Sequence, residues 1–173
     1  MTVPVVETER LVLRGWRPED RAPMARANAD AEVTRWIGDG APLDRAASDA
    51  FVDAIVEQWR ARGFGLWAVE ERAGGAMLGL CGLSVPWFLP SVLPAVEIGW
   101  RLERSAWGRG YATEAAAAAL AHAFDDLGLT EVIATIFPEN IRSVRVAEKL
   151  GMVRTGERNH PSGACVAVYR IRP

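Results

Sequence analysis

Apolar residues recur along the chain with two different periods, and these periods divide it into strands and helices. Apolar and polar residues alternate over residues 10–16, which predicts a first strand. Between Asp44 and Gly63 the apolar residues instead recur at helical spacing, which predicts a long helix with an aspartate N-cap and a glycine stop. The remaining pattern predicts further helices over residues 18–29, 31–36 and 140–150, and strands over residues 66–71, 77–85, 95–102, 130–137, 152–156 and 164–171.

The segment Trp107–Glu114 organises this pattern, because it joins the central strand 95–102 to an alanine-rich helix through a glycine loop. Thr113 is the candidate N-cap of that helix. The amides of residues 108–112 then have no partner within the helix, and the positive end of the helix dipole lies behind them. Such a helix start binds phosphate, although two glycines also occur in ordinary tight turns. The loop lacks the lysine of a P-loop and the third glycine of a dinucleotide fingerprint.

Several short strings of residues, taken together, identify a family. They are Glu97-Ile98-Gly99-Trp100, Trp107-Gly108-Arg109-Gly110-Tyr111-Ala112-Thr113-Glu114, Pro138-Glu139-Asn140, Glu148-Lys149-Leu150-Gly151-Met152, and the opening Thr8-Glu9-Arg10-Leu11. Over residues 7–170 the chain resembles the GCN5-related N-acetyltransferases, in particular the branch that resembles ribosomal-protein N-terminal acetyltransferases. The resemblance implies one acetyltransferase domain over residues 1–173, with acetyl-coenzyme A as the donor. It also implies an α/β (α+β) fold with a mixed, mostly antiparallel sheet of about seven strands, splayed at the cofactor site and flanked by about four helices.

Composition restricts the partners that this chain can have. Half of its 173 residues are hydrophobic, which favours a folded domain over a disordered chain. The net charge of −2 gives no basis for binding nucleic acid or an anionic membrane. No signal peptide or membrane span is recognised, so a cytoplasmic protein is expected. Cys81 and Cys165 are expected to be buried apolar residues, and no metal site is expected.

Acetyl transfer to an amine needs a group that accepts the amine proton, and Glu97 is the candidate. It lies in an apolar strand, where burial would raise the pKa of its carboxyl group; otherwise it is a solvent-facing or ion-paired glutamate. The resemblance implies that water can relay the proton and that a backbone amide near Trp100 holds the oxyanion. Many relatives carry a tyrosine acid two residues before Lys149, where this chain has Ala147. Ser143 is the candidate replacement, and water or no acid at all are the alternatives.

The residues expected to bind the cofactor lie on the central strand, the glycine loop and the last helix. The resemblance implies that Asn140 hydrogen-bonds the pantetheine arm, although Asn140 also suits a helix N-cap. Trp107 stands where many relatives have Gln or Arg, so Arg104 or Arg109 would supply charge to the pyrophosphate. Arg145 and Lys149, four residues apart on the last helix, could reach the adenosine phosphates. The full set is Trp100, Leu102, Arg104, Trp107, Gly108, Arg109, Gly110, Tyr111, Ala112, Thr113, Asn140, Ser143, Arg145 and Lys149.

The amine acceptor is expected on the side of the central strand away from the glycine loop. Its walls are predicted to be residues 36–42, residues 86–94 and the loop around His160, with Trp36, Trp87 and His160 as contacts. These walls are apolar and aromatic with few acids, which favours a peptide N-terminus or a modestly polar amine over a polyamine. An acetyltransferase for small amines or antibiotics, and an acyl-coenzyme A sensor without turnover, are the alternatives. A homodimer is left open.

Overall fold

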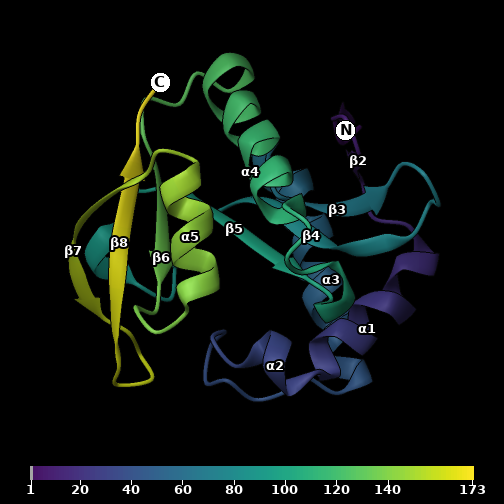
Figure 1. Cartoon of the computed structure of the whole chain (residues 1–173), viewed down its shortest axis with the longest axis horizontal. Helices are drawn as coiled ribbons and strands as arrows, with labels where there is room; N and C mark the ends of the chain where they lie inside the picture. Colours follow the sequence, from purple (N-terminus) through teal and green to yellow (C-terminus); the bar gives the residue numbers. More distant parts are fainter. Residues whose placement is uncertain (1) are drawn as a thin grey trace.

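A computed structural model describes residues 2–173 as one mixed sheet with helices on both faces (Figure 1). In sheet order the strands are β1 (Val6–Glu7), β2 (Leu11–Arg14), β3 (Leu66–Glu71), β4 (Met77–Ser84), β5 (Glu97–Leu102), β6 (Val132–Ile136), β8 (Cys165–Ile171) and β7 (Val153–Asn159). The helices are α1 (Arg21–Ala29), α2 (Ala31–Thr34), α3 (Arg45–Arg62), α4 (Tyr111–Ala121) and α5 (Ile141–Lys149). Single turns of other helix types are η1 (Pro18–Asp20), η2 (Pro90–Val92), η3 (Arg104–Ala106) and the π-helical η4 (His122–Asp126).

The predicted α/β fold class with a mixed, mostly antiparallel sheet is confirmed, and the sheet has one strand more and the protein one α-helix more than predicted. The sheet has eight strands because the short β1 pairs with the edge of β2, and five α-helices flank it. None of the helices within residues 2–173 combines the length and the hydrophobicity that crossing a bilayer requires.

Strands β5 and β6 form the one parallel pair described in this sheet, and they share a single pair of facing residues, Glu97 and Ile133. The Ile133 amide donates to the Val96 carbonyl at 2.9 Å. Beyond this position, which we call the splay point, the two strands diverge (Figure 1). The other neighbouring strands run antiparallel with longer registers. The splay implied by the resemblance is therefore present, and it leaves backbone groups of β5 and β6 without ladder partners.

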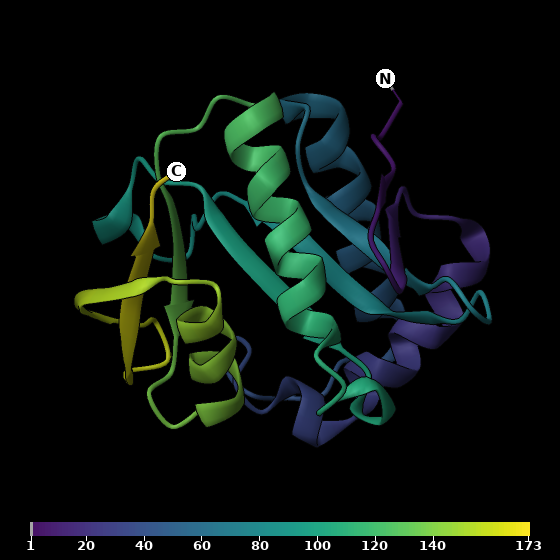
Figure 2. The ribbon, with the colours of Figure 1, turned by 45° about the horizontal axis from the view of Figure 1, so that its top comes forward.

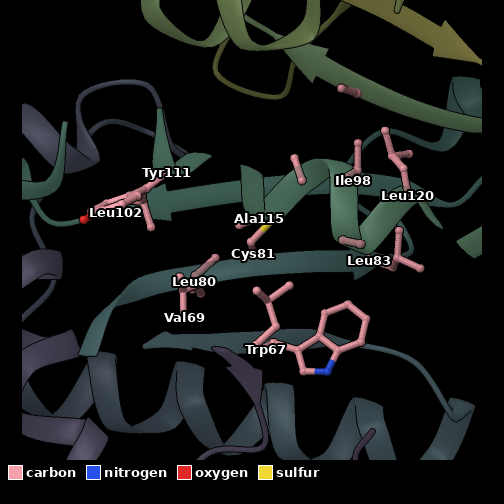
Figure 3. Packing of buried hydrophobic residues seen from close by; sticks show 14 of the residues in the cluster. Trp67, Val69, Leu80, Cys81, Leu83, Ile98, Leu102, Tyr111, Ala115 and Leu120 are labelled. Carbon is pink, nitrogen blue, oxygen red and sulfur yellow. The ribbon is translucent and has the colours of Figure 1, made fainter. Parts of the chain in front are cut away.

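Helix α4 lies on one face of the sheet and α3 on the other (Figure 2). Ile98 and Leu102 of β5 pack beneath α4, where Ile98 lies beside Leu120 and Leu102 lies beside Tyr111 (Figure 3). Ala115 is completely buried, and its small side chain lets the helix approach the sheet closely. The alanine run therefore does more than favour a helix, because its small side chains also determine how closely α4 and the glycine loop pack against β5.

Helix α3 begins and ends where the sequence predicts. The Asp44 side chain accepts a hydrogen bond from the Ala47 amide at 2.7 Å, and Gly63 ends the helix with φ of 77°. Helix α4 is less regular than expected, because its last turn is the π-helical η4. Within that turn His122 is buried, and its Nδ1 atom lies 2.7 Å from the Asp126 carboxylate.

Candidate active site

The glycine loop leads into α4 without a side-chain cap. Gly110 is the N-cap residue and has φ of 83°, a left-handed conformation that favours glycine. The helix starts at Tyr111, so Thr113 lies within its first turn, and the expectation that Thr113 caps the helix is wrong. Because no side chain caps α4, its first amides can bind an anion at the positive end of the helix dipole.

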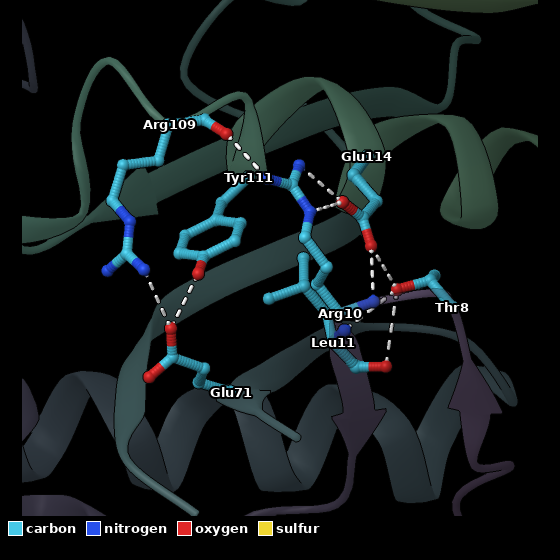
Figure 4. A network of polar contacts seen from close by, with 7 residues as sticks. All are labelled: Thr8, Arg10, Leu11, Glu71, Arg109, Tyr111 and Glu114. Carbon is cyan, nitrogen blue, oxygen red and sulfur yellow. Dashed lines mark hydrogen bonds and ion pairs between the residues drawn. The ribbon is translucent and has the colours of Figure 1, made fainter. Parts of the chain in front are cut away.

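A polar network holds the glycine loop against the first strands of the sheet (Figure 4). Glu114, in the first turn of α4, accepts a hydrogen bond from Arg10 Nε at 2.7 Å. The same guanidinium donates to the Arg109 carbonyl at 2.9 Å. On the other side, Glu71 at the end of β3 accepts from the Tyr111 hydroxyl at 2.5 Å. The loop backbone is therefore fixed from two sides, which fixes the direction of its amides.

The two arginines expected at the pyrophosphate both have carboxylate partners within the chain. The guanidinium of Arg109 lies 3.1 Å from Glu71 and 4.7 Å from the centre of the Tyr111 ring. Arg104 lies 3.1 Å from the Asp30 carboxylate. Both side chains are exposed, so these pairs are weak and a phosphate can compete for them. Their assignment to the cofactor stays a prediction.

Further positive charge lies on α5 beside the glycine loop. Arg145 and Lys149 are exposed on α5, and within residues 2–173 neither forms an ion pair. Trp107 is held by a hydrogen bond from its indole nitrogen to the Leu102 carbonyl at 2.8 Å. The guanidinium of Arg142 lies 4.5 Å from the centre of the Trp107 ring. Sequence reasoning missed Arg142, although its spacing of three residues from Arg145 places both on one side of the helix.

Glu97 lies at the splay point and is 9 % exposed. Its Oε1 atom accepts hydrogen bonds from the Thr135 amide at 3.0 Å and from the Thr135 hydroxyl. The carboxylate thus satisfies a β6 amide beyond the last residue pair that β5 and β6 share. Burial raises the pKa of Glu97 to about 7, and the hydrogen bonds from Thr135 oppose that rise. Oε2 takes part in neither bond, so one carboxylate oxygen remains to accept a proton near neutral pH.

Trp100 and Ser143 connect the central strand to the last helix. The Trp100 indole nitrogen donates to the Ser143 hydroxyl oxygen at 3.3 Å, which leaves the hydroxyl hydrogen for another acceptor. Asn140 is the N-cap of α5, because its side-chain oxygen accepts from the Ser143 amide at 3.3 Å. The amide NH₂ of Asn140 stays available to a ligand, so both roles considered for it are compatible. Ala147 is completely buried.

Three segments expected to line the acceptor meet around Phe137, the residue that follows β6. The ring centres of Trp36 and Phe137 lie 6.0 Å apart. The His160 ring lies 5.1 Å from Phe137 and 5.5 Å from Phe88 of the loop 86–94. Burial lowers the pKa of His160, which favours its neutral form. A hollow of 660 Å³ opens beside Phe88 and His160. Sequence reasoning included Phe88 only as part of the loop 86–94 and missed Phe137.

Trp87 does not join this aromatic cluster. It is 62 % exposed, and the Arg62 guanidinium lies 5.3 Å from the centre of its ring. It borders a different hollow, together with Pro94 and Arg172. The loop turns between residues 87 and 88, so Phe88 takes the place near His160 that the sequence suggested for Trp87.

The two cysteines have different environments. Cys81 is buried as expected, but Cys165 is exposed, which contradicts the expectation for it. Cys165 is the first residue of β8 and pairs with Asn159 of β7. This part of β8 extends beyond the residues that pair with β6, so it has a neighbouring strand on one side only. Within residues 2–173 no three side chains of His, Cys, Asp and Glu gather where they could hold a metal ion.

Comparison with known proteins establishes the family. The model of the acetyltransferase (GNAT) domain matches residues 10–153. The protein YkkB of Bacillus subtilis is 41% identical over 147 residues, which cover 84% of this chain and 83% of YkkB. An acetyltransferase from Agrobacterium tumefaciens has the same fold with a TM-score of 0.85 and 28% identity, over 100% of this chain and 96% of that one. The chain therefore belongs to the GNAT acetyltransferase family and is an acetyltransferase.

A more distant neighbour extends the comparison at the level of the fold alone. Mycobacterium smegmatis RimJ, solved in complex with CoA-disulfide, has a TM-score of 0.80 and 19% identity. The match covers 99% of this chain and 90% of RimJ.

Proposed function

We propose that this protein transfers an acetyl group from acetyl-coenzyme A to a primary amine by direct attack, with Glu97 as the base. The observation that carries the proposal is a buried carboxylate with a pKa of about 7 at the splay point of a GNAT fold. The neutral amine attacks the thioester carbonyl and forms the new C–N bond. Its proton passes to Glu97 directly or through a water, and the C–S bond breaks as the thiolate leaves.

We propose that the donor binds with its pyrophosphate on the amides of residues 108–112. Three observations support this placement: α4 has no side-chain cap, Gly110 is left-handed, and the polar network fixes the loop. A protein with the same fold has been solved with CoA-disulfide, which supports coenzyme A as the carrier. The pantetheine arm would then pass Asn140, and the thiolate would leave beside Ser143. The hydroxyl of Ser143 has its hydrogen free to donate to that thiolate.

We propose that the acceptor enters over the aromatic cluster formed by Trp36, Phe88, Phe137 and His160. The cluster is apolar, and the lowered pKa of His160 keeps it from adding positive charge. These features favour a peptide or protein N-terminus over a polyamine or an aminoglycoside, which would need several carboxylates. That residues 1–173 form a single acetyltransferase domain and that the protein acts in the cytoplasm stay predictions, and a homodimer is left open.

One alternative from another class has an observation in its favour. The tyrosine acid of many relatives is replaced by the buried Ala147, so the chain could bind acyl-coenzyme A as a sensor without turnover. The raised pKa of Glu97 favours the enzyme, because a sensor has no use for a proton acceptor at the splay point.

The test is release of coenzyme A thiol over a panel of peptides, small amines and antibiotics. We expect turnover with at least one peptide, and a loss on the order of 10²-fold in Glu97→Gln with unchanged coenzyme A affinity. Tight binding of acetyl-coenzyme A with no turnover of any amine would establish the sensor instead. Efficient turnover of spermidine or an aminoglycoside and of no peptide would overturn the acceptor ranking.

A further inference from the structure

Arg101 lies on the same face of β5 as Glu97, two positions beyond Gly99. That face points away from α4 and towards α1 and α3, because the Arg101 side chain reaches Asn28 of α1 and Phe51 of α3. Between the two charged residues, a Cβ atom built on Gly99 would meet no heavy atom within 4 Å. Open space therefore separates the proposed base from Arg101 along the central strand.

The guanidinium of Arg101 is held in place by neutral groups. Its Nη1 atom donates to the Asn28 side-chain oxygen at 2.7 Å, and its Cζ lies 4.8 Å from the centre of the Phe51 ring. Asn28 is itself completely buried and oriented, because its NH₂ donates to the Ser48 hydroxyl at 2.9 Å. The Nε of Arg101 is buried and has no hydrogen-bond partner within residues 2–173.

Arg101 differs from the other arginines of the described chain. Within residues 2–173 no carboxylate lies within 4.0 Å of its guanidinium, whereas most arginines there form ion pairs. The other arginines without such a pair, namely Arg26, Arg62, Arg142, Arg145 and Arg158, are all exposed to solvent. Among the arginines without an anion, Arg101 alone is partly buried, with its Nε atom shielded from solvent, and this burial lowers its pKa to about 10.

We propose that Arg101 binds a carboxylate of the acceptor, so that the substrate of this enzyme is a primary amine that also carries a carboxylate. The proposal rests on the proposed function, and it specifies the acceptor further. Nη1 is already used by Asn28, so the edge formed by Nε and Nη2 is the one left for an anion. That edge presents two parallel N–H groups, which match the two oxygens of a carboxylate.

The strand sets the spacing that the acceptor must span. Two residues of a strand extend about 7 Å. The Cα atom of Arg101 therefore lies about 7 Å along the strand from that of Gly99 and about 13 Å from that of Glu97. An amine delivered near the splay point and a carboxylate bound at Arg101 are therefore several bonds apart. A peptide with an acidic side chain close to its N-terminus has this arrangement, whereas a free α-amino acid such as glycine is too short.

The experiment compares acceptors that differ only in the carboxylate. We would measure thiol release with the tripeptide amides Ala-Glu-Gly and Ala-Gln-Gly, and with 6-aminohexanoate and its amide. In the wild type the acidic member of each pair should have a kcat/KM about 10- to 100-fold higher. Arg101→Met should abolish this preference through a higher KM for the acid, and Arg101→Lys should restore part of it. Arg26→Met, which removes an exposed unpaired arginine, should keep the full preference.

Each outcome decides between the proposals. If thiol is released but the wild type treats acid and amide alike, or if Arg101→Met keeps the preference, the assignment of Arg101 is wrong while the acetyltransferase function stands. If no amine of either kind is turned over, the proposed function fails and the assignment fails with it. Turnover of the amide acceptors by Arg101→Met at a rate within about threefold of the wild type shows that the variant is folded, so that its lost preference is informative.

Discussion

Replacing Glu97 with Gln should make this protein more stable at pH 8 while it removes most of its activity. The side chain of Gln keeps the shape of Glu and an oxygen that can still accept from the Thr135 amide, a bond of 3.0 Å in the structure. What it removes is a negative charge on a side chain that is 9 % exposed. An alanine would instead leave the Thr135 amide without a partner, so glutamine is the better probe.

The sign and size of the effect follow from the pKa of Glu97. Burial raises that pKa from 4.5 to about 7, so the folded protein binds the proton more tightly than the unfolded chain. The ionised carboxylate therefore destabilises the fold, by a negligible amount well below pH 4.5 and increasingly as the pH rises from there to 7. Above pH 7 the cost is constant at about 3 kcal/mol, since each pH unit corresponds to about 1.4 kcal/mol. Glu97→Gln does not bear this cost at any pH.

Urea denaturation at pH 5 and pH 8 measures the difference. The free energy of unfolding of Glu97→Gln should exceed that of the wild type by about 3 kcal/mol at pH 8 and by less than about 1 kcal/mol at pH 5. Glu139→Gln is the matched control, because Glu139 is exposed and should change stability little at either pH. In parallel, wild-type kcat/KM should rise with pH and level off above about 7. Equal stabilities at pH 8, or an advantage that does not shrink at pH 5, would refute the reasoning.

Two further predictions concern the cofactor side of the site. Gly110→Ala should lower the free energy of unfolding by about 1–2 kcal/mol, because φ is 83°, and should also weaken coenzyme A binding measured by calorimetry. Gly63→Ala, with φ of 77° at the far end of α3, should cost similar stability without any effect on binding, and equal affinities of the two variants would contradict the phosphate site. Ser143→Ala should lower kcat on the order of 10²-fold if its hydroxyl protonates the thiolate. A change of less than threefold in stopped-flow thiol release would show that the thiolate leaves unaided.

Several local features were predictable because they depend on neighbours in the sequence. The cap at Asp44 and the stop at Gly63 use bonds within one helix turn, so the boundaries of α3 follow from residue types alone. The glycine loop between a strand and a helix is equally local. The error at Thr113 was also local, and it arose because Gly110 could take a left-handed φ and start the helix earlier.

The chemistry of the site depended on contacts between distant residues. The sequence by itself determined the family, the central strand β5 and the choice of Glu97 as the candidate base. These follow from contiguous strings of residues and from the residue types of a strand. Only the tertiary structure brought Thr135 to the Glu97 carboxylate and Phe137 between Trp36 and His160. It alone left Arg101 without a carboxylate, since ion pairing and burial are set by packing between elements that no local pattern encodes.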